Sequence, residues 1–158
     1  MRQVHLQTPI HADYTPNRPF FSPSLPTQDM STLTEIKTPD APAAQGPYSQ
    51  GILVTPSGFI YISGCIPLVP PEDHVIPGGI IPQTQQTLKN FKAILEKGGS
   101  NIGKVIKTTV FVKDLNDFAK VNEEYAKFFG THKPARATIE VARLPLDVLI
   151  EIEGVAIL

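Results

Sequence analysis

Apolar residues recur with two different periods along this chain, and the alternation between the periods predicts its secondary structure. Short runs rich in β-branched and aromatic residues predict strands, because such side chains pack well on a pleated surface. Longer segments with an apolar residue every three or four positions predict helices that bury one face. The predicted strands span 51–55, 59–63, 105–112 and two runs within 134–158, and the predicted helices are marked by Ile81 to Leu95 and by Phe118 to Phe128.

Residues with strong preferences for helix ends stand at these boundaries. Pro82 suits the first turn of the first helix, where an N–H has no intrahelical partner, and the glycines at 98–99 end it. Asp114 or Asn116 is the predicted cap of the second helix, and Gly130 is its predicted stop. The two helical segments are therefore bounded on both sides.

The resulting order, β-β-α-β-α-β-β, predicts an α+β fold in which two helices cover one face of a single sheet. Helical crossovers allow parallel pairing, so we expect a mixed sheet. The other face carries threonine, arginine and glutamate beside aliphatic residues. A half-apolar face without a covering layer favours an oligomer whose partner sheets bury it.

The first part of the chain has a different composition. Residues 1–29 hold five prolines and show no apolar periodicity, which is typical of a disordered extension. We assign 1–35 to a flexible N-terminal extension and 36–158 to the folded domain. The extension is either a tail upstream of a start at Met30 or a targeting segment, although its few arginines and many prolines disfavour the amphipathic helix of a mitochondrial presequence.

Composition excludes several classes of partner. The chain has a formal net charge of −1 and no Lys/Arg run, so bulk electrostatics do not favour nucleic acid or anionic membranes. No apolar run approaches the roughly 18 residues of a membrane span. The single cysteine, Cys65, excludes an internal disulfide and fits a reducing compartment, and the four histidines lack metal-ligand spacing. We therefore expect a cytoplasmic protein, or a mitochondrial one if residues 1–29 are a presequence.

The last 25 residues place charged side chains among strand aliphatics. A turn at Leu144 and Pro145 predicts a terminal hairpin, and alternation then puts Arg136 and Glu151 diagonally opposite each other on the face away from the helices. Buried charges raise the free energy of the fold unless they are paired or functional. Arginine binds carboxylates with two parallel hydrogen bonds, and Glu151 is able to hold or activate a water. A simple Arg–Glu salt bridge is the structural alternative.

Several blocks of the sequence, in order, resemble the RidA (YjgF) family of enamine/imine deaminases. The resemblance covers residues 30 to 158. The matching blocks are Ala-Pro-Ala-Ala-Gln-Gly-Pro-Tyr-Ser-Gln-Gly at 41–51, Ile-Ser-Gly-Cys-Ile-Pro at 62–67, Lys-Thr-Thr-Val-Phe-Val-Lys-Asp-Leu at 107–115, Pro-Ala-Arg at 134–136 and Glu-Ile-Glu at 151–153.

The resemblance implies a chorismate-mutase-like α+β fold and a homotrimer with active sites in clefts between subunits. It implies hydrolysis of 2-aminoacrylate, 2-iminopropanoate and 2-iminobutanoate to 2-keto acids and ammonia, with no organic cofactor or metal. Arg136 then corresponds to the carboxylate-binding residue, and Glu151 to the residue that positions the water. The implied substrate-binding residues are Tyr48, Ser63, Gly64, Asn122 and Thr138.

Three departures from the family pattern bear on specificity. Cys65 stands where many members have glutamine, Ala137 where many have serine, and Thr138 where many have cysteine. Because the arginine and glutamate are kept, we expect the reaction to survive. The alternatives are a non-catalytic keto-acid-binding or regulatory protein, and a ribonuclease or translation inhibitor. The lack of a basic patch or a histidine acid/base pair argues against nuclease chemistry.

Overall fold

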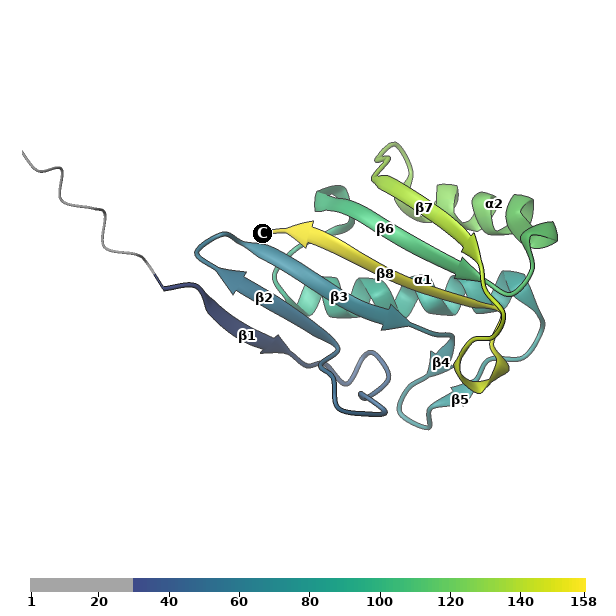
Figure 1. Ribbon diagram of the computed structural model, residues 1–158, viewed down its shortest axis with the longest axis horizontal. Coiled ribbons are helices and arrows are strands. Elements are labelled where there is room, and N and C mark those ends of the chain that lie inside the picture. Colours follow the sequence, from purple (N-terminus) through teal and green to yellow (C-terminus); the bar gives the residue numbers. More distant parts are fainter. Residues whose placement is uncertain (1–29) are drawn as a thin grey trace, which may run out of the picture.

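A six-stranded mixed sheet runs through the molecule, and both helices pack against one of its faces (Figure 1). This computed structural model describes residues 30–158. The predicted disorder or targeting role of residues 1–29 lies outside the described residues. The strand order is β1-β2-β3-β8-β6-β7, and all neighbours are antiparallel except β6 and β7. The strands are β1 (Thr32–Ile36), β2 (Gly51–Thr55), β3 (Phe59–Cys65), β6 (Val105–Val112), β7 (Ala135–Glu140) and β8 (Ile150–Ile157).

The two helices lie close to their predicted positions. Helix α1 (Ile80–Lys97) packs on β3 and β8, and α2 (Phe118–Phe129) contacts α1. Asp114 accepts a hydrogen bond from the Asn116 backbone N–H and so caps a 3₁₀ turn, Leu115–Asp117, that leads into α2. Gly130 ends α2 with a positive φ of 60°, a conformation that glycine adopts without strain. The predicted α+β fold, with two helices on one face of a mixed sheet, is confirmed.

Strand β8 lies at the centre of the sheet and supplies much of its helix-facing surface. Ile150, Ile152 and Ala156 are fully buried, as the alternation along this strand predicts. Gly154 continues the same face, where a Cβ atom would come within 2.8 Å of the Phe91 ring. The absence of a side chain at Gly154 therefore lets α1 pack tightly against the sheet.

The prediction that the last two strands form a hairpin is wrong. Strand β8 hydrogen-bonds to β3 on one side and to β6 on the other, so β6 separates it from β7. Strand β7 pairs in parallel with β6, which the α2 crossover between them permits. Residues 141–149, including the 3₁₀ turn Pro145–Asp147, cross from the edge of the sheet to its centre instead of forming a tight turn.

Three short strands were not anticipated. Strand β1 pairs with β2 along its whole length, so the domain boundary placed between residues 35 and 36 falls inside this strand. The segment predicted as a loop at 67–79 contains β4 (Leu68–Val69) and β5 (His74–Val75), which form a small separate sheet. Within residues 30–158, no helix is both long and apolar enough to cross a membrane.

Candidate functional site

A β-bulge in β3 gives the candidate site its geometry. Ile62 pairs with Gly154 of β8, whereas Cys65 pairs with Ile152, so β3 holds one extra residue between the two pairs. Ile62 and Cys65 are both buried on the helix side. The extra residue therefore leaves both Ser63 and Gly64 partly exposed where strict alternation would have turned one inward.

Glu151 lies directly against this bulge. A Cβ atom added at Gly64 would stand 1.8 Å from Glu151 Oε1 and 2.8 Å from its Cδ, so only glycine leaves room for the carboxylate. The side chain is half-buried, and this burial is the main cause that raises the pKa of Glu151 above the ordinary glutamate value. The negative charge of Glu153 adds to the increase in pKa. Glu151 is thus a carboxylate with increased basicity, as a general base requires.

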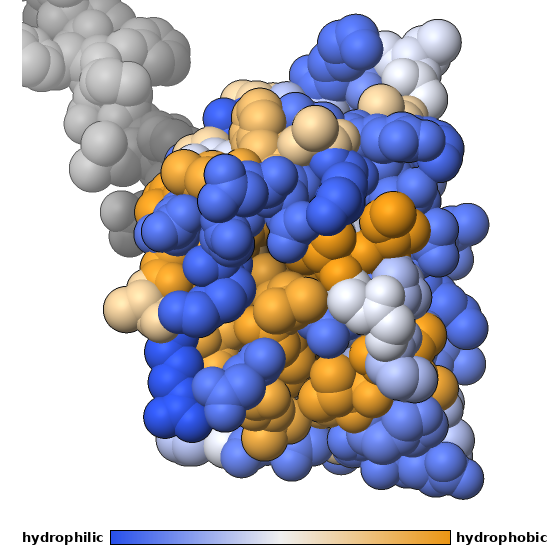
Figure 2. Space-filling model, turned by 90° about the vertical axis from the view of Figure 1, so that its right-hand side faces the viewer, coloured by the Kyte–Doolittle hydropathy of each residue, from blue (hydrophilic) through white to orange (hydrophobic). Residues whose placement is uncertain are grey.

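A cavity of about 540 Å³ opens beside this carboxylate. Its wall is formed by β3, β8, the loop before β2 and the loop before β8. Figure 2 shows the end of the molecule where the loop before β8 lies, with an apolar surface surrounded by polar side chains. The lining residues are Gln45, Tyr48, Ser63, Gly64, Ile66, Pro145, Leu146, Glu151 and Glu153.

Hydrogen bonds hold the loop that carries Tyr48. The Tyr48 hydroxyl accepts a hydrogen bond from the Gln45 backbone N–H at 3.0 Å. Ser63 donates from its hydroxyl to the Ser49 carbonyl at 2.7 Å, which ties the bulge to this loop. The buried Gln50 side chain donates to the carbonyls of Thr38, Ala41 and Pro42 and fixes the start of the same loop. Tyr48 is therefore presented to the cavity by an ordered segment.

Part of the cavity wall is a short loop with an unusual backbone. Leu146 and Asp147 both have φ values of 55°, which is uncommon for residues with a side chain. Arg143 donates two hydrogen bonds to the Asp147 carboxylate, at 2.7 and 2.9 Å, and so closes this loop. Leu146 remains 64% exposed at the mouth of the cavity. An apolar residue in this place suits a ligand with a short alkyl side chain.

Arg136 does not line this cavity. It belongs to β7, and its side chain packs against α2. It pairs in register with Thr108, a fully buried residue of the helix-facing side, and its guanidinium carbon is 4.6 Å from the centroid of the Tyr125 ring. Asn122 lies on the same helix, one turn from Tyr125, and its Oδ1 is buried without a hydrogen-bond partner among the described residues. Thr138 pairs with Val110 and so follows Arg136 on the same face of β7.

The predicted site residues thus form two groups within one chain. Tyr48, Ser63, Gly64 and Glu151 surround the cavity, whereas Arg136, Asn122 and Thr138 lie on or beside β7 and α2. The prediction that Arg136 and Glu151 converge on one sheet face is wrong for the single chain. Glu151 pairs with Phe111 on the open side of the sheet, and Arg136 is on the helix side.

The predicted alternative, an Arg–Glu salt bridge, is not formed in the single chain either. Of the salt bridges within residues 30–158, none involves Arg136 or Glu151. Both charges are therefore available to a ligand or to another subunit.

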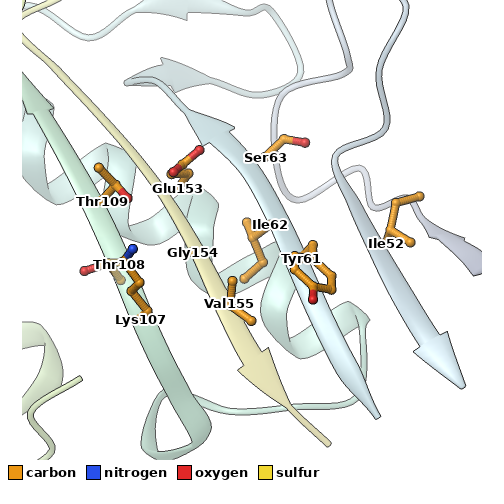
Figure 3. Close-up of a pocket in the computed structure, with 10 residues that line it drawn as sticks. All are labelled: Ile52, Tyr61, Ile62, Ser63, Lys107, Thr108, Thr109, Glu153, Gly154 and Val155. Atoms are coloured by element: carbon orange, nitrogen blue, oxygen red, sulfur yellow. The ribbon is translucent and has the colours of Figure 1, made fainter. Parts of the chain in front are cut away.

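A shallow groove of about 320 Å³ runs across the open face of the sheet and meets the cavity. Figure 3 shows its side chains rising from β2, β3, β8 and β6, with Ser63 and Glu153 towards one end. Both residues also line the cavity beside Glu151. Tyr61, on this face, is 50% exposed, and Phe59 and Ile157 are also exposed. This apolar open face is typical of a surface that packs against another subunit.

The described part of the chain holds neither a cluster of metal-ligand side chains nor an exposed thiol. No group of three or more His, Cys, Asp or Glu side chains suited to a metal ion occurs within residues 30–158. Cys65 is buried, and this burial raises the pKa of its thiol far above the ordinary value, which disfavours the reactive thiolate. Cys65 behaves as a small core residue.

Replacing Gly64 by alanine is expected to displace the Glu151 carboxylate by an ångström or more, and so to lower about 100-fold the rate of a reaction in which this carboxylate acts as the base. The free energy of unfolding is expected to change by about 1 kcal/mol or less, since only a flexible carboxylate must move. Steady-state kinetics and thermal unfolding measure the two effects. Gly103→Ala, outside the cavity lining, is the control, and equal loss in both variants would contradict this role of Gly64.

Together these features define an α+β protein with a half-buried carboxylate beside a small-molecule-sized cavity. The chain belongs to the family described as Endoribonuclease L-PSP, whose model matches residues 38–158, and this is the RidA (YjgF) family that its motifs resemble. The resemblance therefore extends over nearly all of the described domain.

Relatives and solved structures agree with this assignment. A 2-iminobutanoate/2-iminopropanoate deaminase from Escherichia coli is 51% identical over 125 residues, covering 77% of this chain and 95% of the relative. A RutC family protein from Pyrococcus horikoshii is 53% identical over 121 residues, covering 77% and 94%. The crystal structure of the YjgF gene product from E. coli has a TM-score of 0.73 and 51% identity, covering 78% of this chain and 98% of that one.

Proposed function

We propose that this chain hydrolyses 2-iminobutanoate and 2-iminopropanoate, together with their enamine tautomers, to 2-keto acids and ammonia. The observation that carries this proposal is the Glu151 carboxylate lodged against Gly64 beside a cavity of about 540 Å³, in a chain 51% identical to a deaminase of that name. The cavity is large enough for a four-carbon substrate and a water.

The reaction needs one well-placed base. Glu151 accepts a proton from water as the oxygen bonds to the imine carbon, and the protonated Glu151 passes that proton to the imine nitrogen, which gives a carbinolamine. Glu151 then takes the hydroxyl proton and transfers it to the amino group as the C–N bond breaks, which releases ammonia and leaves the keto acid. Free imines already hydrolyse in water, so a general base contributing about 100- to 10,000-fold is sufficient.

Arg136 supplies the binding energy for the substrate carboxylate. Its guanidinium makes no salt bridge with the other described residues, and arginine binds carboxylates through two parallel hydrogen bonds. Because Arg136 and Glu151 lie on opposite faces of the sheet, a second copy of the chain must bring its Arg136 to the Glu151 cavity. The apolar open face and the groove that meets this cavity support such packing.

The assembly that we propose is a homotrimer, with each site shared by two neighbouring subunits. A cyclic arrangement repeats one interface and gives every subunit the same pair of contacts. Sedimentation equilibrium of the full chain tests this arrangement. A monomer at the concentrations used for activity would contradict it, because the two groups of residues would then never meet.

The activity is tested by coupling the purified chain to a PLP-dependent dehydratase that acts on serine or threonine. We expect the chain to accelerate ammonia release from the imine above the spontaneous rate. A chain that binds pyruvate or 2-ketobutyrate in calorimetry but gives no acceleration is instead a non-catalytic keto-acid binder. That result would refute the proposed hydrolysis.

The pH dependence follows from the raised pKa of Glu151. A general base is active only when deprotonated, so kcat/KM is expected to fall as pH decreases through this pKa, at a higher pH than for an ordinary glutamate. Glu153→Gln removes the like charge, lowers the pKa of Glu151 and moves the acid limb to lower pH. The dependence of kcat/KM on pH, measured for the wild type and for Glu153→Gln, shows the difference. An unchanged acid limb in Glu153→Gln would show that another group controls it.

A further inference from the structure

The guanidinium of Arg136 rests against aromatic rings instead of a carboxylate. Its central carbon is 4.6 Å from the centroid of the Tyr125 ring and 5.7 Å from that of Phe118. Both distances lie within the range in which an aromatic face attracts a cation. Both rings come from α2, so this helix determines where the end of the Arg136 side chain lies.

Tyr125 is held firmly in its position. It is 8% exposed, and its hydroxyl forms a 2.7 Å hydrogen bond with that of Thr108, which is fully buried. Thr108 is also the residue that pairs with Arg136 between β6 and β7. The strand that positions the Arg136 backbone therefore also anchors the ring that contacts its guanidinium.

This arrangement differs in effect from an ion pair. A carboxylate partner would occupy guanidinium N–H donors and compete with a substrate carboxylate. A ring face attracts the cation without accepting those N–H groups. The contact therefore restricts the side chain while its donors remain free for a ligand.

We propose that Tyr125 is a positioning residue, which orients the Arg136 guanidinium for carboxylate binding through its ring and without touching the substrate. The proposal rests on the carboxylate-binding role of Arg136 in the proposed function. It assigns to the Tyr125 hydroxyl a separate, structural task, which is to satisfy the buried Thr108.

Three variants distinguish the effect of the aromatic ring on ligand binding from the effect of the Tyr125 hydroxyl on stability. Tyr125→Leu removes both, and we expect it to weaken binding of 2-ketobutyrate about 5- to 30-fold, the range for a largely desolvated cation–π contact. Tyr125→Phe keeps the ring, so its binding is expected to stay within about threefold of wild type, although its melting temperature falls because Thr108 loses its partner. Phe118→Leu, at a more exposed and more distant ring, is expected to weaken binding about twofold to fivefold.

Calorimetry on the full-length protein measures these dissociation constants, and thermal unfolding is recorded for each variant. Phe118→Leu keeps the test informative if Tyr125→Leu does not fold. Equal weakening by Tyr125→Leu and Tyr125→Phe would overturn the proposal, since the ring would then have no role of its own. Unchanged binding in both Tyr125→Leu and Phe118→Leu would overturn it as well.

A second background tests whether the ring acts through the arginine. In Arg136→Gln, the further change Tyr125→Leu is expected to alter 2-ketobutyrate binding less than twofold, as measured by ligand-observed NMR at millimolar concentrations. A loss as large as in the wild-type background would overturn the proposal, as would a wild-type protein that does not bind 2-ketobutyrate. A wild-type protein that binds the keto acid but hydrolyses no imine would refute the proposed function alone.

Discussion

Replacing Arg136 by alanine is expected to lower kcat/KM for imine hydrolysis about 100- to 10,000-fold. The substitution removes two charge-assisted hydrogen bonds to the substrate carboxylate, each contributing about 1.5–3 kcal/mol. Ammonia release in the coupled dehydratase assay measures the effect. Arg136 makes no salt bridge within residues 30–158, but its guanidinium lies against the Tyr125 and Phe118 rings, so the free energy of unfolding is expected to fall by about 1–3 kcal/mol.

Arg136→Lys is the matched control for this prediction. Lysine keeps the positive charge but lacks the planar pair of donors, so we expect a loss between those of wild type and Arg136→Ala. The oligomeric state of both variants is checked by sedimentation. Activity of Arg136→Ala within threefold of wild type would show that another group binds the carboxylate.

Replacing Glu151 by glutamine is expected to lower kcat about 100- to 10,000-fold, because the amide cannot accept a proton from water. The binding of 2-ketobutyrate is expected to change little, since Arg136 is intact. A carboxylate whose pKa is raised in the folded state lowers stability above that pKa, so Glu151→Gln is expected to melt at or above the wild-type temperature at neutral pH. Kinetics, calorimetry and thermal unfolding test the three statements.

The two inactive variants also test whether one site draws on two subunits. Equal amounts of Arg136→Ala and Glu151→Gln are unfolded, mixed and refolded so that mixed trimers form. The mixture is expected to regain about a quarter of the wild-type activity, because one interface in four then pairs an intact arginine with an intact glutamate. A mixture that stays inactive although mixed trimers have formed would place both residues of a site in one chain. The structure of the single chain, with the pair on opposite faces, favours recovery.

Local patterns along the chain predicted more of the fold than of the site. The periodicity of α1 and α2, the glycine that ends α2 and the alternation along β8 all agree with the structure. These features depend on residues within a few positions of one another. The motifs likewise indicated Tyr48, Ser63, Gly64 and Glu151, which do surround one cavity.

Features that depend on distant segments were not predicted. No local signal indicates the bulge at Ser63 and Gly64, because it exists only in the register between β3 and β8. Tyr125 lies within the predicted second helix, marked by Phe118 to Phe128, but its contact with Arg136 depends on where β7 lies in the sheet. A tight turn was predicted at Leu144 and Pro145, whereas Leu146, the next residue, lines the cavity from a longer loop.

The sequence by itself determined which faces of the helices and of β8 are buried, and which arginine and glutamate match the positions to which the family motifs assign the chemistry. The tertiary structure alone decided that β6 lies between β7 and β8, and therefore that Arg136 and Glu151 lie on opposite faces of the sheet. The reason is physical. Alternation is encoded by neighbouring residues, whereas strand pairing is settled by which distant segments together bury the apolar face of a central strand against the helices.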